Sequence, residues 1–403
     1  MDPIRNPYAP GAGTPPPELT GREALIERAR ILFARIEAGR SEKSFIAVGL
    51  RGVGKTVLLS RIAEMAEAKA FRVCLFEARE GKRLAELLIP QLRRVLLELD
   101  RRGQLSEQVK RGLRILKSFV GGLRLKYADI ELGLDIEPET GAADSGDLEA
   151  DLPELFVAIG RAARARETAV ALIIDEIQYL STGDMSALIM ALHRTSQLNL
   201  PIVLVAAGLP QVVGQTGKSK SYAERLFDFP AVGALDRLDA DRAITIPAEL
   251  QQVRFEPAAL DLIFDVTQGY PYFLQEWAYH AWNTAASPRI GRPEVLTAGD
   301  VALARLDESF FRVRFDRLTP REKDYLRAMA ELGPGPHRTA EIADCLKIGA
   351  PSVAPLRSGL IAKGMIFSPA HGDTAFTVPL FDAYLRRTIP DWRTPYVVRP
   401  TST

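Results

Sequence analysis

The chain has 403 residues, of which 47% are hydrophobic and 26% are charged, and its formal net charge is +1. This composition matches an ordinary soluble protein that is long enough for two or three domains. The near-zero net charge excludes a global field that would attract nucleic acid, so any such partner needs a local basic patch.

The N-terminus, MDPIRNPYAPGAGTPPPEL, lacks the apolar core of a signal peptide. No stretch reaches the roughly 18 uncharged apolar residues of a membrane span. The two cysteines, Cys74 and Cys345, and the four histidines show no metal-ligand spacing, so we expect inert thiols and no structural metal site. These features predict a cytoplasmic protein with no membrane contact.

Residues 1–20 read as a Pro-rich arm, and residues 21–235 as an α/β core. Thr20 and Glu23 have the spacing of a capping box that would open a helix. Four apolar runs then alternate with helical patterns: SFIAVGL, FRVCLFEA, TAVALIIDE and LPIVLVAAGLP. This alternation predicts a parallel sheet covered by helices on both faces.

A charged insertion covers about residues 101–152. Residues 101–126 are basic, and the following residues are acidic and rich in Gly and Ser. Lys110, Arg114 and Lys117 share one helical face, which is either solvated, paired with the acidic segment, or a contact for nucleic acid. LRLKYADIELGLDIE alternates apolar and polar residues, which predicts a strand pair.

Residues 236–317 read as a helical lid, residues 318–390 as a winged helix-turn-helix domain and residues 391–403 as a tail. Helices near 320–332, 339–346 and 352–363 precede two short strands around His371. From Arg321 to Pro390 nine Lys and Arg face seven Asp and Glu, a balance of +2. The domain is therefore either a DNA reader or a protein-docking module. The third helix exposes four candidate readers, Ser352, Arg357, Ser358 and Lys363.

A phosphate-binding loop follows the first strand. Residues 49–56 fit the pattern G-x-x-x-x-G-K-[ST] and open a helix; they are Gly49-Leu50-Arg51-Gly52-Val53-Gly54-Lys55-Thr56. Glycines allow the backbone amides to curl around phosphate oxygens, and the helix dipole adds to their attraction. The predicted ATP-binding residues of this loop are Gly49, Arg51, Gly52, Val53, Gly54, Lys55, Thr56 and Val57.

An acidic pair ends the third strand, in ALIIDEIQYL. We predict that Asp175 and the Thr56 hydroxyl hold Mg²⁺, and that Glu176 polarises an attacking water as general base. In a chain without a phosphate-binding loop, an acidic pair after a strand is more often a helix N-cap followed by a solvated carboxylate. The phosphate-binding loop upstream favours the catalytic interpretation, with Lys55 neutralising the transferred phosphate.

The phosphate-binding loop and the acidic pair occur together with three further motifs, LTGREALI, SYAERLF and GYPYFLQ. As a set, they resemble the AAA+ ATPases. The similar branch includes archaeal origin-recognition initiators, archaeal-type ATPases and STAND signalling ATPases. The resemblance covers nearly the whole chain, and it is strongest to bacterial ATP-binding AAA proteins with a C-terminal winged helix. It implies a P-loop ATPase core with a helical lid.

The resemblance also implies roles outside the two main motifs. Gly21 and Arg22 would lie beside the adenine, or simply form the approach to a capped helix. Arg225 would be an arginine finger that acts in trans, or a surface residue paired with Glu224 or Asp228. Gly269 and Pro271 match a lid motif that packs on the nucleotide, or serve only as a helix breaker.

Two positions depart from that family pattern. Residues 206–208 are Ala-Ala-Gly where a polar sensor would end the strand, and Gln275 stands where many relatives carry a sensor arginine. Both changes remove contacts to the γ-phosphate, which predicts slow hydrolysis and a state set by ATP binding. The expected function is an ATP-dependent conformational or assembly switch, with ATP, Mg²⁺ and other copies of the chain as partners. The alternative is an ATP-dependent, DNA-binding initiator or loader.

Overall fold

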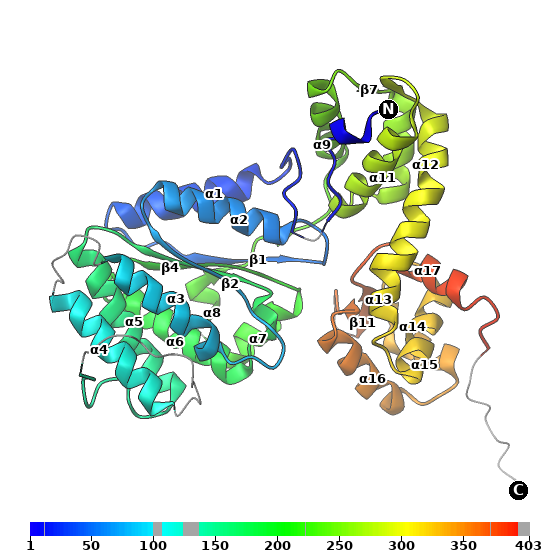
Figure 1. Cartoon of the computed structure of the whole chain (residues 1–403). Helices are drawn as coiled ribbons and strands as arrows, with labels where there is room; N and C mark the ends of the chain where they lie inside the picture. The colour runs from blue at the N-terminus through cyan, green and yellow to red at the C-terminus, as the bar shows by residue number, and fades with distance from the viewer. Residues whose placement is uncertain (12, 100–106, 124–136, 222, 371, 394–403) are drawn as a thin grey trace, which may run out of the picture. The chain divides into compact units, whose positions relative to one another are not determined.

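The computed structural model describes residues 1–11, 13–99, 107–123, 137–221, 223–370 and 372–393 (Figure 1). Two compact units divide the chain. The first comprises Met1–Gly21, Leu50–Gly54 and Gly233–Thr403, and the second comprises Arg22–Gly49 and Lys55–Val232. Residues 124–136 of the predicted strand pair, His371 of the predicted wing and residues 394–403 of the predicted tail lie outside the described residues.

A parallel sheet forms the centre of the second unit. Its described strands follow the order β2-β3-β4-β1-β5, and β6 also pairs with β1. All of these pairs are parallel. The strands are β1 (Ser44–Gly49), β2 (Arg72–Glu77), β3 (Val170–Asp175), β4 (Ile202–Gly208), β5 (Phe227–Asp228) and β6 (Ala231–Val232). The predicted parallel α/β fold is therefore present.

Helices cover both faces of this sheet (Figure 1). Ile46, Leu172 and Leu204 point into a core formed with α3 to α6, whereas α1 and α2 lie on the opposite face. Strands buried on both faces explain the continuous apolar runs in the sequence. The helices are α1 (Glu23–Glu37), α2 (Lys55–Ala68), α3 (Leu84–Leu99), α4 (Glu107–Gly122), α5 (Leu148–Ala165), α6 (Thr182–Gln197), α7 (Gln211–Ser219) and α8 (Ala223–Leu226), with a 3₁₀ turn at Ile177–Tyr179.

The first unit contains two groups of helices. The first group comprises α9 (Arg237–Leu250), α10 (Pro257–Thr267), α11 (Pro271–Thr284) and α12 (Arg292–Arg305), with a short pair β7 (Arg254–Phe255) and β8 (Arg289–Ile290). The second comprises α14 (Pro320–Leu332), α15 (Thr339–Leu346), α16 (Ala350–Ala362) and α17 (Phe381–Thr388), with β9 (His337–Arg338), β10 (Ile366–Phe367) and β11 (Asp373–Phe376) in the order β10-β11-β9. Strand β9 and helix α17 have no counterpart among the predicted elements.

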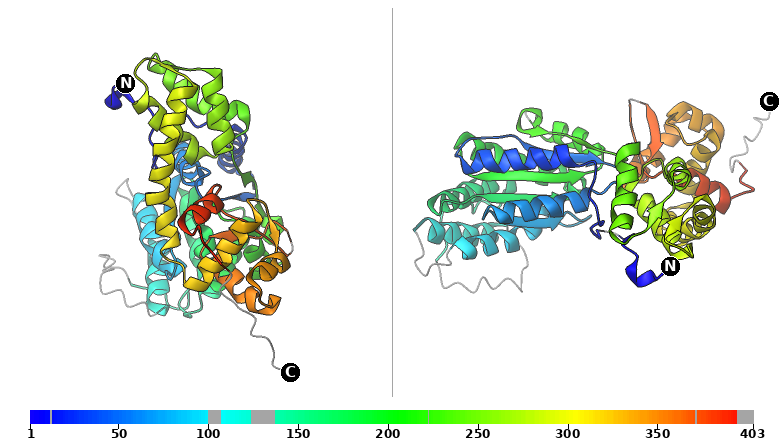
Figure 2. Two further views of the ribbon diagram at one scale, coloured as in Figure 1. Left: turned by 90° about the vertical axis from the view of Figure 1, so that its right-hand side faces the viewer. Right: turned by 90° about the horizontal axis from the view of Figure 1, so that it is seen from above.

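A long helical rod joins these two groups. Helix α12 continues through a π-helical segment, Leu306–Phe311, into α13 (Arg312–Phe315), and both figures show the rod as one feature (Figures 1 and 2). A π-helical turn holds an extra residue and changes the direction of the side chains that follow it. Phe311 in this segment packs against Phe381 and Tyr384 of α17, with ring centroids 5.6 Å and 5.2 Å away.

The predicted capping box at Thr20 is wrong. Helix α1 begins at Glu23, and Arg22 is its N-cap without a side-chain capping bond. Gly21 adopts a positive φ of 67°, which turns the chain away before the helix starts. The Thr20 hydroxyl donates instead to the Asp239 carbonyl, at 2.9 Å.

Candidate nucleotide-binding site

The phosphate-binding loop links β1 to α2, since β1 ends at Gly49 and α2 begins at Lys55. Gly52 and Gly54 adopt φ values of 80° and 89°, which favour glycine because a side chain would clash with the backbone. A Cβ on Gly54 would meet nothing within 4 Å, so its side of the loop is open. The sequence motif thus forms the turn that it predicts.

Lys55 is buried at the start of α2, with 5% of its surface exposed. Its Nζ donates to the Gly49 carbonyl at 3.0 Å, so the side chain folds back over the loop. A buried ammonium group is costly without a compensating anion. This geometry suits Lys55 to a phosphate bound in the loop.

Thr56 and Asp175 meet at the carboxyl edge of the sheet. The Thr56 hydroxyl donates to Asp175 Oδ2 at 2.5 Å, across 119 positions of sequence. Burial raises the pKa of Asp175, although the hydrogen bonds from Thr56 and from the Glu176 amide act in the opposite direction. Hydroxyl and carboxylate oxygens are the ligands that Mg²⁺ prefers, so this pair fits the predicted metal.

Glu176 follows Asp175 in a left-handed backbone conformation, with φ of 51°. Its amide donates to Asp175 Oδ1 at 2.8 Å, and its carboxylate accepts a hydrogen bond from Gln178 Nε2. Gln178 Oε1 in turn accepts from the Leu209 amide at 3.0 Å. Gln178 thus links the acidic pair to the end of β4.

Sequence reasoning missed Gln178. Gly208 is the residue that makes room for it, because a Cβ there would lie 2.8 Å from Gln178 Oε1. The only hint in the sequence is an amide side chain two positions after Glu176, because its burial and its place opposite a glycine appear only in the fold. The neighbouring positions Ala206 and Ala207 are buried and offer no polar group, so the departure seen in the sequence is also present in the fold.

The predicted lid motif contacts the middle of the loop within the first unit. The Tyr272 amide donates to the Gly52 carbonyl at 3.3 Å, and Pro271 is the first residue of α11 between Tyr270 and Tyr272. Gly269 must be glycine because a Cβ would lie 2.1 Å from the Leu235 carbonyl. Tyr270 and Tyr272 are therefore further residues beside the loop.

Residues 18–205 match the AAA ATPase domain family, and residues 308–385 match a domain of unknown function. Residues 18–205 of this chain are thus similar to AAA ATPase domains. The Walker-type ATPase of Pyrococcus abyssi is similar in structure, with 18% identity, a TM-score of 0.60, and 91% of this chain and 96% of that chain covered. The fold is therefore that of the AAA+ P-loop ATPases.

Two further solved structures show a weaker likeness. The Orc1 protein of Aeropyrum pernix, solved in complex with DNA, has 17% identity and a TM-score of 0.46, with 92% of this chain and 93% of that chain covered. RuvB of Thermotoga maritima, a Holliday junction branch migration motor, has 16% identity and a TM-score of 0.42, with 88% and 92% covered. No match was found among curated proteins.

Gly21 and Arg22, the two residues predicted to lie beside the adenine, belong to different compact units. Gly21 packs in the first unit, where a Cβ would lie 2.7 Å from Asp239 Oδ2, and Arg22 is buried in the second. Their predicted place beside the adenine stays a prediction.

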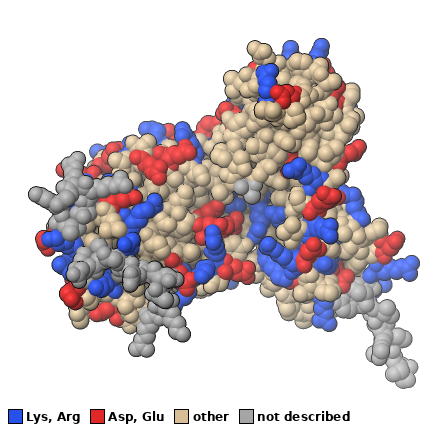
Figure 3. Space-filling view, viewed as in Figure 1, with Lys and Arg blue, Asp and Glu red and all other residues tan. Residues whose placement is uncertain are grey.

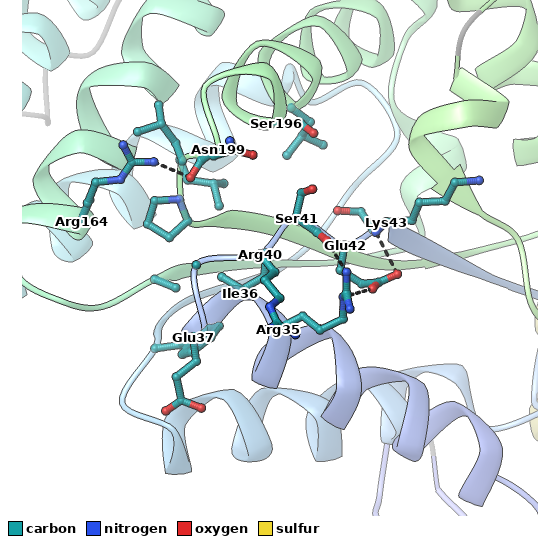
Figure 4. Close-up of a pocket in the computed structure, with 18 of the residues that line it drawn as sticks. Arg35, Ile36, Glu37, Arg40, Ser41, Glu42, Lys43, Arg164, Ser196 and Asn199 are labelled. Atoms are coloured by element: carbon teal, nitrogen blue, oxygen red, sulfur yellow. Dashed lines mark hydrogen bonds and ion pairs between the residues drawn. The ribbon is translucent and has the colours of Figure 1, made fainter.

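Arg225 lies at the amino edge of the sheet, opposite the edge that carries Lys55 and Asp175. It is exposed at the end of α8 and lines a hollow of about 680 Å³ whose labelled residues appear in Figure 4. Within the described residues it pairs with neither Glu224 nor Asp228, since Asp228 binds Arg28 at 2.5 Å and Lys43 at 3.6 Å. Its predicted role as an arginine finger stays a prediction.

Three cations of the basic helix α4 are paired with acidic side chains, either of the helix itself or of the segment after it. Arg111 and Arg114 lie 2.8 Å and 3.8 Å from Glu139, and Lys110 lies 3.1 Å from Glu107. Residues 101–106 and 124–126 of the basic segment lie outside the described residues. On the face shown in Figure 3, acidic and basic side chains are interspersed. The described part of the segment is a paired surface.

The predicted DNA-reading helix α16 also uses its cations internally. Arg357 donates to Thr374 Oγ1, Ser368 Oγ and the Asp373 carbonyl at 2.9, 2.8 and 2.9 Å. Lys363 lies 2.7 Å from Glu322. Ser352 and Ser358 are exposed.

Along the described parts of the chain, no helix is both long and apolar enough to cross a membrane.

Proposed function

We propose that this protein is an ATPase in which ATP binding and slow hydrolysis set a conformational or assembly switch. The observation that carries the proposal is the hydrogen bond between Thr56 and Asp175, because it joins the two motifs at one edge of the sheet. Lys55 lies beside them and interacts with the Asp175 charge. Mg²⁺ bound by Thr56 and Asp175 would supply charge neutralisation for the phosphates.

Within this proposal, Glu176 orients and deprotonates the attacking water. Its carboxylate is already held by Gln178, and β4 ends in apolar residues, so little polar machinery remains for the γ-phosphate. Slow turnover follows from this shortage. Arg225 would add its charge to the site of a second copy, since it is exposed and lies on the opposite edge of its own sheet.

The C-terminal helices α14 to α16 with β10 and β11 are proposed to form a winged helix that docks protein. Its cations at Arg357 and Lys363 are engaged within the domain, and few remain to neutralise a phosphate backbone. The alternative, a DNA-binding initiator or loader, requires duplex binding that depends on ATP and weakens with salt. If fluorescence anisotropy detects such binding, the protein functions as a DNA-binding initiator or loader and the proposed switch is wrong.

Glu176→Gln tests the enzymatic part of the proposal. We expect ATP hydrolysis to fall by about 100-fold or more because the general base is lost, with ATP affinity unchanged. Steady-state phosphate release and a nucleotide titration measure the two quantities. Glu64→Gln, on the exposed side of α2, is the control. Unchanged turnover in the Glu176 variant would remove Glu176 from this role, and many ATP per second in the wild type would refute slow hydrolysis.

A further inference from the structure

A hollow of about 630 Å³ lies on the second unit, and its lining includes no residue of the predicted nucleotide site. Helices α4, α5 and α6 form it, and α5 packs against both of the others on one face of the sheet (Figure 1). Each helix contributes residues that recur at helical spacing and so share one face, namely Gln108, Arg111 and Ile115 of α4, Pro153, Val157 and Arg161 of α5, and Met190, Arg194 and Gln197 of α6. The hollow is therefore a groove that runs along α5.

The floor of this groove is apolar and only partly covered by the described residues. Ile115 and Ala158 are buried, with 4% and 7% of their surfaces exposed, whereas Pro153, Val157 and Met190 are half-buried. Apolar surface that stays in contact with water favours an apolar ligand, because covering it releases that water. The volume of the hollow lies within the range of about 300–1,000 Å³ that is typical of sites for small organic molecules. The groove thus suits a small ligand with an apolar part.

One end of the groove is closed by the segment from Glu139 to Ala143. Arg111 Nε donates to Glu139 Oε1 at 2.9 Å, and the Ser118 hydroxyl donates to the Glu139 carbonyl at 2.9 Å, so the segment is fixed to α4. The Ala143 amide donates to Glu154 Oε2 at 2.7 Å, which fixes the segment to α5. Both carboxylates of the lining are therefore engaged by the chain itself, and the walls of the groove are formed before a ligand binds.

Two arginines at the other end lack such partners. Arg161 has no hydrogen-bond or ion-pair partner among the described residues, and Arg194 donates to Gln197 Oε1 at 3.4 Å. Both side chains are exposed. The lining holds three arginines and two glutamates, and Glu139 is already paired with Arg111. This end of the groove therefore carries positive charge that the chain does not neutralise.

The two arginines lie at the same level of their helices. Helices α5 and α6 lead into the amino ends of β3 and β4, which are neighbouring parallel strands, so the two helices run in the same direction. Arg164 of α5 donates to the Leu198 and Asn199 carbonyls that follow α6. Arg161 and Arg194 each lie about one turn before these contacts. Two like charges side by side repel each other, and an anion between them would replace that repulsion with attraction.

We propose that this groove binds an organic carboxylate with an unbranched apolar chain. The carboxylate pairs with Arg161 and Arg194, because a guanidinium donates two parallel hydrogen bonds to a carboxylate. The apolar chain lies over Val157 and Met190, along the helical rise of about 12 Å that separates Pro153 from Arg161. The site uses no residue of the nucleotide site, so it adds a second ligand to the proposed ATPase.

A nucleic-acid backbone fits this groove less well than a single carboxylate does. Affinity for such a backbone grows with the number of phosphates that are neutralised, and only Arg161 and Arg194 are left for that purpose. The half-buried apolar floor offers nothing to a phosphate or a ribose. The combination of an apolar floor with one cationic end matches a ligand that is apolar along its length and anionic at its tip.

Calorimetric titration of the whole chain with sodium decanoate, below the concentration at which it forms micelles, tests the proposal. We expect saturable binding to the wild type, and an affinity about 10-fold lower in Arg161→Gln and in Arg194→Gln, as for the loss of a charged hydrogen bond. Arg40→Gln changes an exposed arginine outside the groove and should bind like the wild type. No saturable binding to the wild type, or equal affinity in all four proteins, would overturn the proposal.

Two further ligands separate the contributions of the chain and the charge. Acetate carries the carboxylate without the chain, and decyltrimethylammonium carries the chain with a positive head group. Each should bind at least about tenfold more weakly than decanoate, because each lacks one of the two contributions. Decyltrimethylammonium that binds as tightly as decanoate would show that the two arginines have no role, and the proposal would be wrong.

A photoreactive diazirine analogue of decanoate locates the site without any substitution. After irradiation, peptide mapping should find the label on α4, α5 or α6 at residues that line the groove, and an excess of decanoate should reduce it several-fold. Label on other parts of the chain, or label that excess decanoate does not displace, would contradict binding in this groove.

Discussion

The phosphate-binding loop and helix α16 both looked like sites for phosphate in the sequence, but the structure uses their cations in opposite ways. Lys55 is buried with its Nζ over an open glycine turn and interacts with Asp175 nearby. Arg357 and Lys363 are held by three hydrogen bonds and an ion pair inside their own domain. A cation serves a ligand only where the fold leaves its donors available.

The comparison also distinguishes the phosphate-binding loop, which is a motif with a defined backbone conformation, from a helix that only carries several cations. The loop motif specifies backbone conformation at Gly52 and Gly54, and the structure has there the positive φ values that glycine adopts most readily. The exposed cations of a helix specify no partner. Their use depends on residues that are distant in sequence, such as Thr374 for Arg357.

Outside the phosphate-binding loop and the acidic pair, the largest effect on activity is expected at Gln178, which supports Glu176 from the end of β4. Gln178→Ala removes the contact to Glu176 and leaves the Leu209 amide without its partner. Hydrolysis should fall about tenfold, as for the loss of an outer partner that orients an active-site group, with ATP affinity changed less than about twofold.

Gly208→Ala gives a matched variant, since its Cβ would displace Gln178 without removing it. The two variants should share one phenotype in phosphate release, including a shifted pH profile of turnover. A Gln178→Ala protein that hydrolyses ATP at the wild-type rate would show that Glu176 needs no support from β4.

Arg357 tests whether a cation of α16 stabilises its own domain rather than binding DNA. Because two of its hydrogen bonds tie α16 to β11 and a third reaches Ser368 after β10, Arg357→Ala should destabilise the C-terminal domain by about 1.5–3 kcal/mol. Denaturant unfolding and limited proteolysis of residues 320–390 measure this change. Ser358→Ala, exposed on the same helix, is the control. A stable Arg357→Ala protein that loses duplex DNA binding would instead make Arg357 a DNA reader.

The smallest effect is expected for a substitution of Asp175, and it concerns the thermal stability of the protein. Burial raises the folded-state pKa of Asp175 above its ordinary value of 3.8, so its ionised form destabilises the folded protein at neutral pH. Asp175→Asn should therefore melt a few degrees higher than the wild type at pH 7 while losing Mg²⁺-dependent ATP hydrolysis.

The difference should shrink as the pH falls through the raised pKa towards 3.8, because Asp175 is then protonated in both folded and unfolded chains. Thermal melts across this range measure it. A gap that widens in acid would contradict a raised pKa.

Much of the fold follows from local pattern. Apolar runs with alternating helices predicted the parallel sheet, and the helices near 320–332 and 339–346 occur at α14 and α15. Thr20 failed as a cap because Gly21 turns the chain before the helix begins. Helix α17 and strand β9 are short and depend on tertiary contacts, which no single stretch of sequence encodes.

The candidate site was predictable to the extent that it is local. Lys55, Thr56 and Asp175 come from motifs with a fixed order along the chain. Gln178 gains its role from a partner far away in sequence, because its Oε1 accepts a hydrogen bond from the Leu209 amide. Single-sequence reasoning has no access to such pairings.

The central claim is that the loop at residues 49–56 holds a triphosphate beside a metal held by Thr56 and Asp175. Calorimetric titration of the wild type and Lys55→Ala with Mg·ATP tests it most directly. The account predicts saturable heat for the wild type and an affinity at least about 100-fold lower for Lys55→Ala, because a buried charge-assisted contact to phosphate is lost. No heat with the wild type, or equal affinity in the two proteins, would contradict it.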